Sequence, residues 1–333
     1  MSRRMHGLRY ERYGAPEDVL RIHEVDAPTP REGEVLVRVR AAAANPLDWH
    51  LVRGEPFLIR MMNGIRGPKD GDVGADCAGV VELVGEGVSD FVPGDEVFGY
   101  GNGSFAELTR AKAARLARKP EGLTFEQAAC IPVAGVTALH ALVTHGRLGT
   151  GQRVLIIGAG GGIGSFAVQI AKALGADVTG VCSGAKADFV RALGADDVVA
   201  YSSENVTTRP ERYDLVVQLA GDYPLSALRR LLTQRGTLVL AGSGAGREGG
   251  GGTFSLLQGF VRARLLTRFT DHTIKMFLSS PGREHLETLA GFVGRGELTP
   301  RIEHTHPLER AAAALTEIEC GHAQGKLVIT VPG

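Results

Sequence analysis

The chain has 333 residues, with 37 Lys and Arg against 37 Asp and Glu, so its formal net charge at neutral pH is zero. Because this balance offers no basic stripe to a polyanion, we expect no nucleic-acid partner. At about 150 residues per domain the length predicts two domains. A share of 44% hydrophobic and 22% charged residues excludes disordered and fibrous proteins.

The four cysteines lie far apart and include no CxxC pair: Cys77, Cys130, Cys182 and Cys320. This spacing argues against a disulfide framework and against a Cys-rich zinc site, and it suits a reducing compartment. An arginine pair near the start is not followed by an apolar segment, so no secretory signal is predicted. We therefore expect a cytoplasmic protein.

The first third of the chain has the pattern of short β-strands. Val35, Val37 and Val39 alternate with a leucine and two arginines, which is the period of a half-buried strand. Residues 79–88 form another apolar run that ends in a glycine turn, and a Pro-Gly-Asp turn precedes a third run at 96–100. Short strands joined by such turns predict a small barrel-like β domain.

From about residue 127 the pattern changes to strands that alternate with helices. The strands are predicted at 153–158, 177–182, 197–201, 214–220 and 236–242, and the helices at 162–175, 185–193 and 224–234. Strands that alternate with helices predict a parallel sheet covered on both faces, which is a doubly wound α/β fold.

The last part of the chain begins with a glycine-rich segment at 242–252, predicted to be a loop that is either a lid over the substrate or disordered. The apolar stretch Thr253–Phe269 is predicted to be core or a contact between subunits. Helices are expected at 283–293 and after Pro307, and a final strand at 326–331.

One uncharged run, Val154 to Ala171, has 18 residues, the minimum for a membrane span. Six of these residues are glycines. A buried strand, a glycine turn and a packed helix explain the run better than lipid does, so no membrane span is expected.

The strand predicted at 153–158 continues into a glycine-rich turn that opens a helix. Ala159, Gly161 and Gly164 fit the dinucleotide-binding fingerprint, with Ala in its first place. A pyrophosphate needs a tight turn, close approach of the backbone and a helix N-terminus facing its charge. The context predicts dinucleotide binding; the alternative is a glycine turn without a ligand.

The end of the next strand distinguishes the two nicotinamide cofactors, because an acidic residue there binds the ribose 2′-hydroxyl of NAD. This chain has Ser183 and Lys186 in that region and no carboxylate. A hydroxyl and an ammonium suit a 2′-phosphate, so we predict NADPH. The alternative is that Lys186 is only a solvated helix residue.

Several segments in fixed order then carry a family resemblance over nearly the full length: NPLDWH (45–50), GADCAGVVELVGEGVSDFVPGDEVFG, GSFAELTRAKAARLARKP, IPVAGVTAL (131–139), GAGGGIGSFAVQIAKALGA and GKLVIT. The sequence resembles the medium-chain dehydrogenase/reductase superfamily and is most similar to its zinc-independent, quinone oxidoreductase-like branch. The resemblance implies a GroES-like β domain (1–126 and 273–333) and a Rossmann domain (127–272), with the C-terminal segment returning to the first domain. It also implies a homodimer.

The chain departs from the zinc alcohol dehydrogenases of that superfamily where these hold metal. Asn45 stands where they have the first Cys ligand, Ala75-Asp76 stands where they have His-Glu, and residues 131–139 contain no Cys. The four-Cys structural zinc lobe is missing as well. No metal site is therefore expected.

The resemblance also implies places for individual residues. It puts Asn45 and Asp48 beside the nicotinamide and substrate, and Thr137 against the nicotinamide. It puts Gly161, Gly162 and Ile163 on the pyrophosphate, and Ser183, Lys186 and Tyr201 around the 2′-phosphate. Ala241, Gly242 and Ser243 would line the nicotinamide side, and Lys326 is a further candidate for a cofactor contact.

These residues predict reduction of a quinone or an α,β-unsaturated carbonyl compound by hydride from NADPH. The resulting oxyanion or enolate needs a donor, with Asn45 as candidate, and a proton from Asp48, His50 or a water. His50 is alternatively a packed or surface group, and Asp48 a helix N-cap. Cys77 and Cys130 are predicted to be small buried residues. The alternative functions are an alcohol or aldehyde reductase and a low-turnover NADPH-binding redox sensor; the substrate itself is not readable from the chain.

Overall fold

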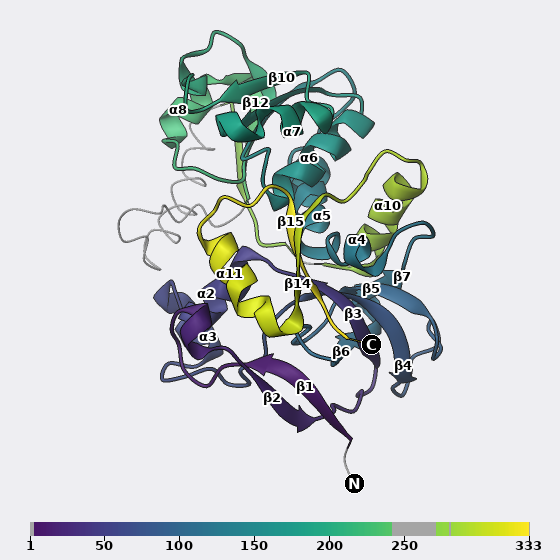
Figure 1. Ribbon diagram of the computed structural model, residues 1–333. Coiled ribbons are helices and arrows are strands. Elements are labelled where there is room, and N and C mark those ends of the chain that lie inside the picture. The colour runs from purple at the N-terminus through teal and green to yellow at the C-terminus, as the bar shows by residue number, and fades with distance from the viewer. Residues whose placement is uncertain (1–2, 242–270, 280, 333) are drawn as a thin grey trace. The chain divides into compact units, whose positions relative to one another are not determined.

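The computed structural model describes residues 3–241, 271–279 and 281–332 and divides into two compact units (Figure 1). The first unit comprises Met1–Val133, Pro281–Gly294 and Pro300–Gly333, and the second comprises Ala134–Ser280 and Arg295–Thr299. The boundaries expected from the sequence, after residues 126 and 272, lie a few residues earlier. The difference arises because one helix after residue 124 packs on the strands of the first unit, while the strand at Thr273–Met276 belongs to the sheet of the second.

The first unit holds most of the strands. Its elements are β1 (Arg4–Arg9), α1 (Pro16–Val19), β2 (Arg21–Asp26), β3 (Glu34–Ala43), α2 (Pro46–Arg53), α3 (Phe57–Asn63), β4 (Asp76–Val84), β5 (Glu96–Tyr100), β6 (Leu108–Lys112), a 3-10 turn (Ala113–Arg115), β7 (Leu116–Arg118), α4 (Phe125–Ala129), α10 (Arg283–Gly294), β14 (Ile302–Pro307), a 3-10 turn (Leu308–Arg310), α11 (Ala311–Glu319) and β15 (Lys326–Thr330).

The larger sheet of the first unit has the strand order β14-β15-β3-β4-β5-β7, and β6 also pairs with β3, while β1 and β2 form a separate antiparallel pair. All neighbours are antiparallel except β14 and β15. The prediction that β3 is half-buried was too simple, because Leu36 is buried as well. Its side chain packs in a separate cluster with Met5 of β1, so both faces are covered at this point.

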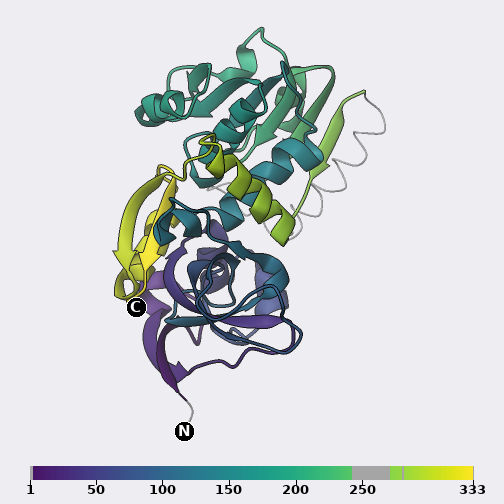
Figure 2. The ribbon, with the colours of Figure 1, turned by 90° about the vertical axis from the view of Figure 1, so that its right-hand side faces the viewer.

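The C-terminal segment returns to the first unit, as expected. β15 pairs antiparallel with β3, with Val328 opposite Ala43 and Thr330 opposite Ala41. In Figures 1 and 2 the yellow strands β14 and β15 accordingly lie beside the purple strands of the N-terminal third. The pairing brings the beginning of β15 next to the end of β3 and the start of α2.

The second unit alternates strands with helices, so the predicted fold class is confirmed. Its elements are α5 (Pro132–Leu139, which begins at the boundary), a π-helical turn (His140–His145), β8 (Arg153–Ile157), α6 (Gly162–Ala173), β9 (Asp177–Cys182), a 3-10 turn (Gly184–Lys186), α7 (Ala187–Ala192), β10 (Asp197–Ala200), a 3-10 turn (Val206–Thr208), β11 (Tyr213–Gln218), α8 (Leu225–Arg230), β12 (Leu232–Leu240) and β13 (Thr273–Met276). The six strands are parallel in the order β10-β9-β8-β11-β12-β13, the 3-2-1-4-5-6 order of dinucleotide-binding sheets.

Two predicted helices are shorter in the structure. The helix expected at 185–193 begins as a 3-10 turn and becomes α-helical only from Ala187 to Ala192. The helix expected at 224–234 ends at Arg230, because Leu232 starts β12 and buries its side chain in the sheet core. Tertiary burial thus overrides helical periodicity at this end.

The uncharged run 154–171 is divided between β8 and α6, and no helix in the described ranges is long and apolar enough to cross a membrane. The predicted loop over 242–252, the stretch Thr253–Phe269 and the candidates Gly242 and Ser243 lie outside the described residues.

Candidate functional site

The glycine turn between β8 and α6 has the geometry that a dinucleotide requires. Gly158 adopts a positive φ of 91°, and the N–H groups of Gly158 and Ala159 both donate to the carbonyl oxygen of Val181 at 3.0 Å. A Cβ at Gly164 would lie 2.1 Å from the Gly158 carbonyl oxygen, so only glycine allows the helix to pack so closely on the turn.

A pyrophosphate fits this turn by both space and charge. Gly161 is the N-cap of α6, and a Cβ there would meet only the Gly158 carbonyl oxygen, at 3.5 Å. Gly162 and Ile163 begin the helix, whose first turn contains no acidic residue. Since first-turn N–H groups have no intrahelical acceptor and the helix dipole is positive at this end, these residues can hold an anion.

The candidates for the 2′-phosphate gather at the carboxyl ends of β9 and β10. Ser183 caps the 3-10 turn that contains Lys186, and the backbone N–H of Tyr201 donates to the Cys182 carbonyl oxygen at 3.0 Å. The side chain of Lys186 lies against Gly160 of the glycine turn, because a Cβ at Gly160 would lie 2.8 Å from its Cδ. The aliphatic part of the Lys186 side chain therefore lies against the glycine turn that contains the predicted pyrophosphate site.

Two other cofactor candidates are buried in the second unit. Ala241 follows β12, and its N–H donates to the Gln218 carbonyl oxygen at 3.0 Å. This contact puts Ala241 at the carboxyl end of the sheet, where ligands of such folds bind. Thr137 lies in α5 and is only 8% exposed.

In the first unit, four polar side chains come together in a buried cluster: Asn45, Asp48, Asp76 and Lys326. Lys326 Nζ lies 2.6 Å from Asn45 Oδ1, 3.1 Å from the Ala44 carbonyl oxygen and 3.4 Å from Asp76 Oδ2. Asp76 Oδ2 also accepts from Asn45 Nδ2 at 2.9 Å, and its Oδ1 accepts from the Val133 N–H at 2.8 Å. This buried polar cluster is the candidate catalytic site.

Strand register assembles the cluster. Asp76 begins β4, where it pairs with Ala43 of β3 on one side and Tyr100 of β5 on the other. Lys326 begins β15, next to the end of β3. Asn45 follows β3 as the N-cap of α2, with Pro46 as the first helical residue.

The hypothesis that Asp48 is an N-cap was wrong by three residues. Asn45 holds that position, and Asp48 is the third helical residue, whose Oδ2 accepts from the Asn45 N–H at 2.8 Å. The contact satisfies one of the N–H groups left without a partner at the start of a helix.

Asn45 has little hydrogen-bonding capacity left for a substrate. Its Nδ2 donates to the Ala43 carbonyl oxygen at 3.1 Å and to Asp76, and its Oδ1 accepts from Lys326. Both amide hydrogens are thus used within the unit. To donate to an oxyanion, Asn45 must exchange one of these bonds; as the structure stands, it positions Lys326 and Asp76.

The two acids of the cluster hold protons more tightly than acids in water do. Burial raises the pKa of Asp48 to about 7, and the negative charge of Asp76 adds to the shift, while the Asn45 N–H and Lys326 oppose it. Burial also raises the pKa of Asp76, against the opposing effect of Lys326. One buried cation thus faces two buried acids, and Asp48 can carry a proton near neutral pH.

His50 is a packed residue in this structure. Its Nδ1 lies 2.8 Å from the Glu55 carbonyl oxygen, and its ring stacks on Trp49 with centroids 3.6 Å apart. Burial lowers its pKa, which favours the neutral ring. Within the described residues, the His50 ring bonds to the Glu55 carbonyl oxygen and makes no hydrogen bond to the buried polar cluster.

Cys77 and Cys130 are fully buried, which confirms the prediction for them. Burial raises the pKa of each thiol to about 12, so neither is a nucleophile at neutral pH. From the sequence, Asp76 stands out only as a departure from a zinc ligand of related dehydrogenases. A single carboxylate at the start of an apolar strand was the signal for a buried partner.

The raised pKa of Asp48 predicts a pH-dependent stability. Because the folded chain binds this proton more tightly than the unfolded chain, whose Asp has an ordinary pKa of 3.8, stability falls as the pH rises from about 4 to about 7. Asp48→Asn keeps an acceptor for the Asn45 N–H but cannot ionise. We expect the variant to be more stable than wild type at pH 8 by at least about 1.4 kcal/mol, the equivalent of one pKa unit.

Urea unfolding at pH 5 and pH 8 measures this difference. The chain has one tryptophan, Trp49 of α2, so its fluorescence reports on the first unit. Asp70→Asn, at an exposed position, controls for the change in net charge. A stability difference between Asp48→Asn and wild type that is the same at both pH values would contradict the prediction.

Two family models match the chain. The alcohol dehydrogenase GroES-like domain matches residues 31–121, and the zinc-binding dehydrogenase domain matches residues 193–329. The first range covers β3 to β7 of the first unit. The second begins directly after α7 of the second unit and ends in β15, so it includes Lys326.

Relatives extend the likeness over the full length. The chain is 32% identical to the chloroplast envelope quinone oxidoreductase homolog of Arabidopsis thaliana, over 98% of each chain. It is 30% identical to the NADPH-dependent alkenal/one oxidoreductase of the same plant, over 96% of this chain and 78% of the relative. The solved quinone oxidoreductase of Coxiella burnetii superposes with a TM-score of 0.85 at 28% identity, over 99% and 100% of the two chains.

Proposed function

We propose, from the premise that this chain belongs to the quinone oxidoreductase branch of the medium-chain dehydrogenase/reductase superfamily, that it is a zinc-independent, NADPH-dependent reductase of quinones or α,β-unsaturated carbonyl compounds. At the coarser level it is an oxidoreductase that uses NAD(P)H and acts on a small molecule. The observation that carries the choice of NADPH is the packing of the Lys186 side chain against Gly160 of the glycine turn, with no acid between Cys182 and Ala187.

The second unit would hold the cofactor. Gly161, Gly162 and Ile163 would donate backbone N–H groups to the pyrophosphate, and Ser183, Lys186 and Tyr201 would hold the 2′-phosphate. Thr137, Ala241 and, from the part outside the described residues, Gly242 and Ser243 would line the nicotinamide. The bound nicotinamide supplies the hydride.

The first unit would stabilise the negative charge that forms on the substrate oxygen and supply the proton to the product. Reduction of a quinone or enone leaves negative charge on oxygen, and the buried ammonium of Lys326, which Asn45 positions, would stabilise it. Asp48, with its pKa raised to about 7, would hold the proton and release it to the product. His50 would support α2 by packing on Trp49.

Zinc-independence is supported by how the polar cluster is already filled. Asp76 has the only side chain of the Ala75-Asp76 pair that offers a metal ligand, and both its oxygens accept hydrogen bonds. The ammonium of Lys326 lies where a cation beside Asp76 and Asn45 would lie. A zinc ion there would have to displace a buried, hydrogen-bonded cation.

The function is tested by titrating metal-depleted protein with NADPH and NADH, then following NADPH oxidation with 1,4-benzoquinone, 9,10-phenanthrenequinone and an enone. We expect tight NADPH binding and turnover that a chelator does not reduce. Loss of turnover with chelator would contradict zinc-independence. Failure to bind either nucleotide would contradict the proposal that the glycine turn binds a dinucleotide.

The alternatives predict other outcomes of the same assay. An alcohol or aldehyde reductase would turn over carbonyl substrates and leave the C=C bond of the enone intact. A low-turnover redox sensor would bind NADPH with no turnover across the panel.

We also propose a homodimer and a cytoplasmic location, the latter supported by four cysteines that form no disulfide.

Removing the Lys186 charge tests the choice of cofactor. Lys186→Ala is expected to lower the ratio of NADPH to NADH efficiency about tenfold, since one lost charge-assisted hydrogen bond costs about 1.5 kcal/mol. The ratio of kcat/KM values measures it. Arg191→Ala is the matched control, because Arg191 is an exposed cation of α7 that pairs with Asp188. An unchanged ratio for Lys186→Ala would contradict the proposal that Lys186 selects NADPH over NADH.

A further inference from the structure

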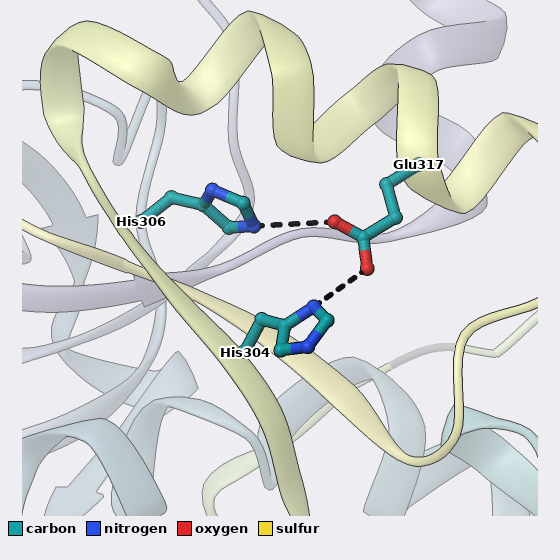
Figure 3. A group of neighbouring side chains, drawn as sticks. All are labelled: His304, His306 and Glu317. Carbon is teal, nitrogen blue, oxygen red and sulfur yellow. Dashed lines mark hydrogen bonds and ion pairs between the residues drawn. The ribbon is translucent and has the colours of Figure 1, made fainter.

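A second group of ligating side chains lies in the first unit, apart from the buried polar cluster. His304 and His306 project from β14 toward Glu317 of α11, one imidazole facing each carboxylate oxygen (Figure 3). His304 Nδ1 lies 2.9 Å from Oε1, and His306 Nε2 lies 3.3 Å from Oε2. One ligand atom from each residue falls within 4.8 Å of the other two.

Strand alternation separates this His-His-Glu group from the buried polar cluster. His304 pairs with Leu327 of β15, and His306 pairs with Ile329. Leu327 and Ile329 bury their side chains in the core under α11, together with Leu315. Because successive side chains of a strand point to opposite faces, Lys326 points to the other face of β15 from the two histidines.

One ligand atom of the group is poorly satisfied by the protein. His306 Nε2 belongs to the buried side-chain atoms of the described residues that make no hydrogen bond, although Glu317 is its near neighbour. The His306 side chain is 16% exposed, whereas His304 is 58% exposed. A buried nitrogen without a hydrogen bond is costly, and an open side next to it gives a cation a path of entry.

The residue types favour a borderline transition metal. Imidazole nitrogens and a carboxylate are ligands of Zn²⁺, with bonds of about 2.0–2.2 Å. Tetrahedral geometry with such bonds sets ligand atoms about 3.3–3.6 Å apart. The 3.3 Å from His306 Nε2 to Glu317 Oε2 matches this spacing, and one ligand atom from each of the three residues lies within 4.8 Å of the others.

We propose that His304, His306 and Glu317 form a binding site for a divalent transition-metal ion of the zinc type, with solvent in the remaining coordination position. The ion joins edge strand β14 to helix α11 and so fastens the C-terminal segment that carries β15. It is independent of the proposed catalysis, because it lies on the opposite face of β15 from Lys326.

Co²⁺ added to the full-length, metal-free protein without a polyhistidine tag tests the site. Co²⁺ in a four- or five-coordinate site absorbs visible light more strongly than the hydrated ion does. We expect one equivalent to bind, Zn²⁺ to displace it, and the melting temperature to rise with added Zn²⁺. Turnover with NADPH and a quinone stays unchanged with and without the ion.

Three variants test which residues hold the Co²⁺ ion. His304→Ala and Glu317→Gln are expected to lower Co²⁺ affinity about 100-fold or more, since loss of a group outside the ligand shell alone costs about 10–100-fold. His304 is exposed, so its variant should fold, which circular dichroism checks. The control is His322→Ala, which removes an exposed histidine near the exposed Cys320.

Affinity retained in His304→Ala and Glu317→Gln overturns the proposal, as does the absence of saturable binding to wild type. Loss of binding in His322→Ala with retention in the other two assigns the ion to Cys320 and His322 instead, and overturns it equally.

Discussion

Replacing Lys326 with methionine is expected to lower the free energy of unfolding by about 3–5 kcal/mol, because the change leaves a buried acid without its cation. Lys326 is 3% exposed and Asp76 is 0% exposed, so water cannot take over the lost contacts. Asn45 Oδ1 and the Ala44 carbonyl oxygen lose their donor as well. The side chain itself keeps a similar volume, so packing contributes little to the loss.

The loss should grow with pH. Burial raises the pKa of Asp76, and the charge of Lys326 opposes this effect. Without Lys326 the pKa of Asp76 rises further, so the carboxylate takes up a proton more readily. In the neutral form it costs little to bury. The variant is therefore expected to lie closer to wild type at pH 5 than at pH 8.

Trp49 fluorescence in urea measures both effects in the unit that contains Lys326. The double variant Lys326→Met/Asp76→Asn should regain part of the stability, because it removes the uncompensated charge. Lys112→Met, at an exposed position of β6, is the matched control and should change stability by less than about 0.5 kcal/mol. If Lys326→Met unfolds at the same urea concentration as wild type, the pair is not what stabilises this region.

The same variant tests the proposed chemistry. Loss of the buried ammonium is expected to lower kcat for quinone reduction while NADPH affinity changes little, because the ammonium of Lys326, a candidate for a cofactor contact in the sequence, is bonded to Ala44, Asn45 and Asp76 and the residues proposed for the pyrophosphate and 2′-phosphate lie in the other unit. Measuring kcat and the NADPH Kd on protein shown to be folded separates this effect from instability. An unchanged kcat would remove Lys326 from the charge-stabilising role.

Gly164→Ala is expected to lower NADPH affinity about 100-fold or more, equivalent to about 2.8 kcal/mol. The added Cβ would meet the Gly158 carbonyl oxygen at 2.1 Å and Ala159 backbone atoms at 2.7 Å. These are backbone atoms, so no flexible side chain can move aside. The start of α6 must shift away from the turn, and its N–H groups then miss the pyrophosphate.

Nucleotide binding is measured by quenching or calorimetry with NADPH, alongside a thermal melt. Gly149→Ala is the matched control in the same unit, because its Cβ would meet nothing closer than 3.6 Å and it does not adopt a positive φ. The control should bind NADPH as wild type does. Wild-type affinity in Gly164→Ala would show that the fingerprint turn does not hold the nucleotide.

The function class was predictable because its signals are local. The glycine fingerprint, the strand before it and the helix after it lie within about 20 residues, where periodicity and turn chemistry act. The bounds predicted at 177–182 and 96–100 agree with β9 and β5 for the same reason. The family resemblance rested on such segments in order, and the relatives confirm it.

Helix ends and burial were less predictable, since they depend on neighbours distant in sequence. The helix predicted to continue to residue 234 ends at Arg230, because β12 needs Leu232 for the sheet core. Leu36 is buried because β1 supplies Met5 against its otherwise exposed face. The sequence of a single strand or helix does not show which distant residues will pack against it.

By itself, the sequence determined the two-domain α/β plan, the glycine turn and the residues after β9 that suit NADPH, because each depends on contacts within a few turns of chain. Only the tertiary structure decided that Lys326 meets Asn45 and Asp76, that Asp48 is the reciprocal partner of the Asn45 cap, and that His304 faces Glu317. Lys326 and Asn45 are 281 residues apart, and strand pairing between β15 and β3 joins them. Spacing along a chain does not reveal such pairings, because register is set when two distant strands share a sheet.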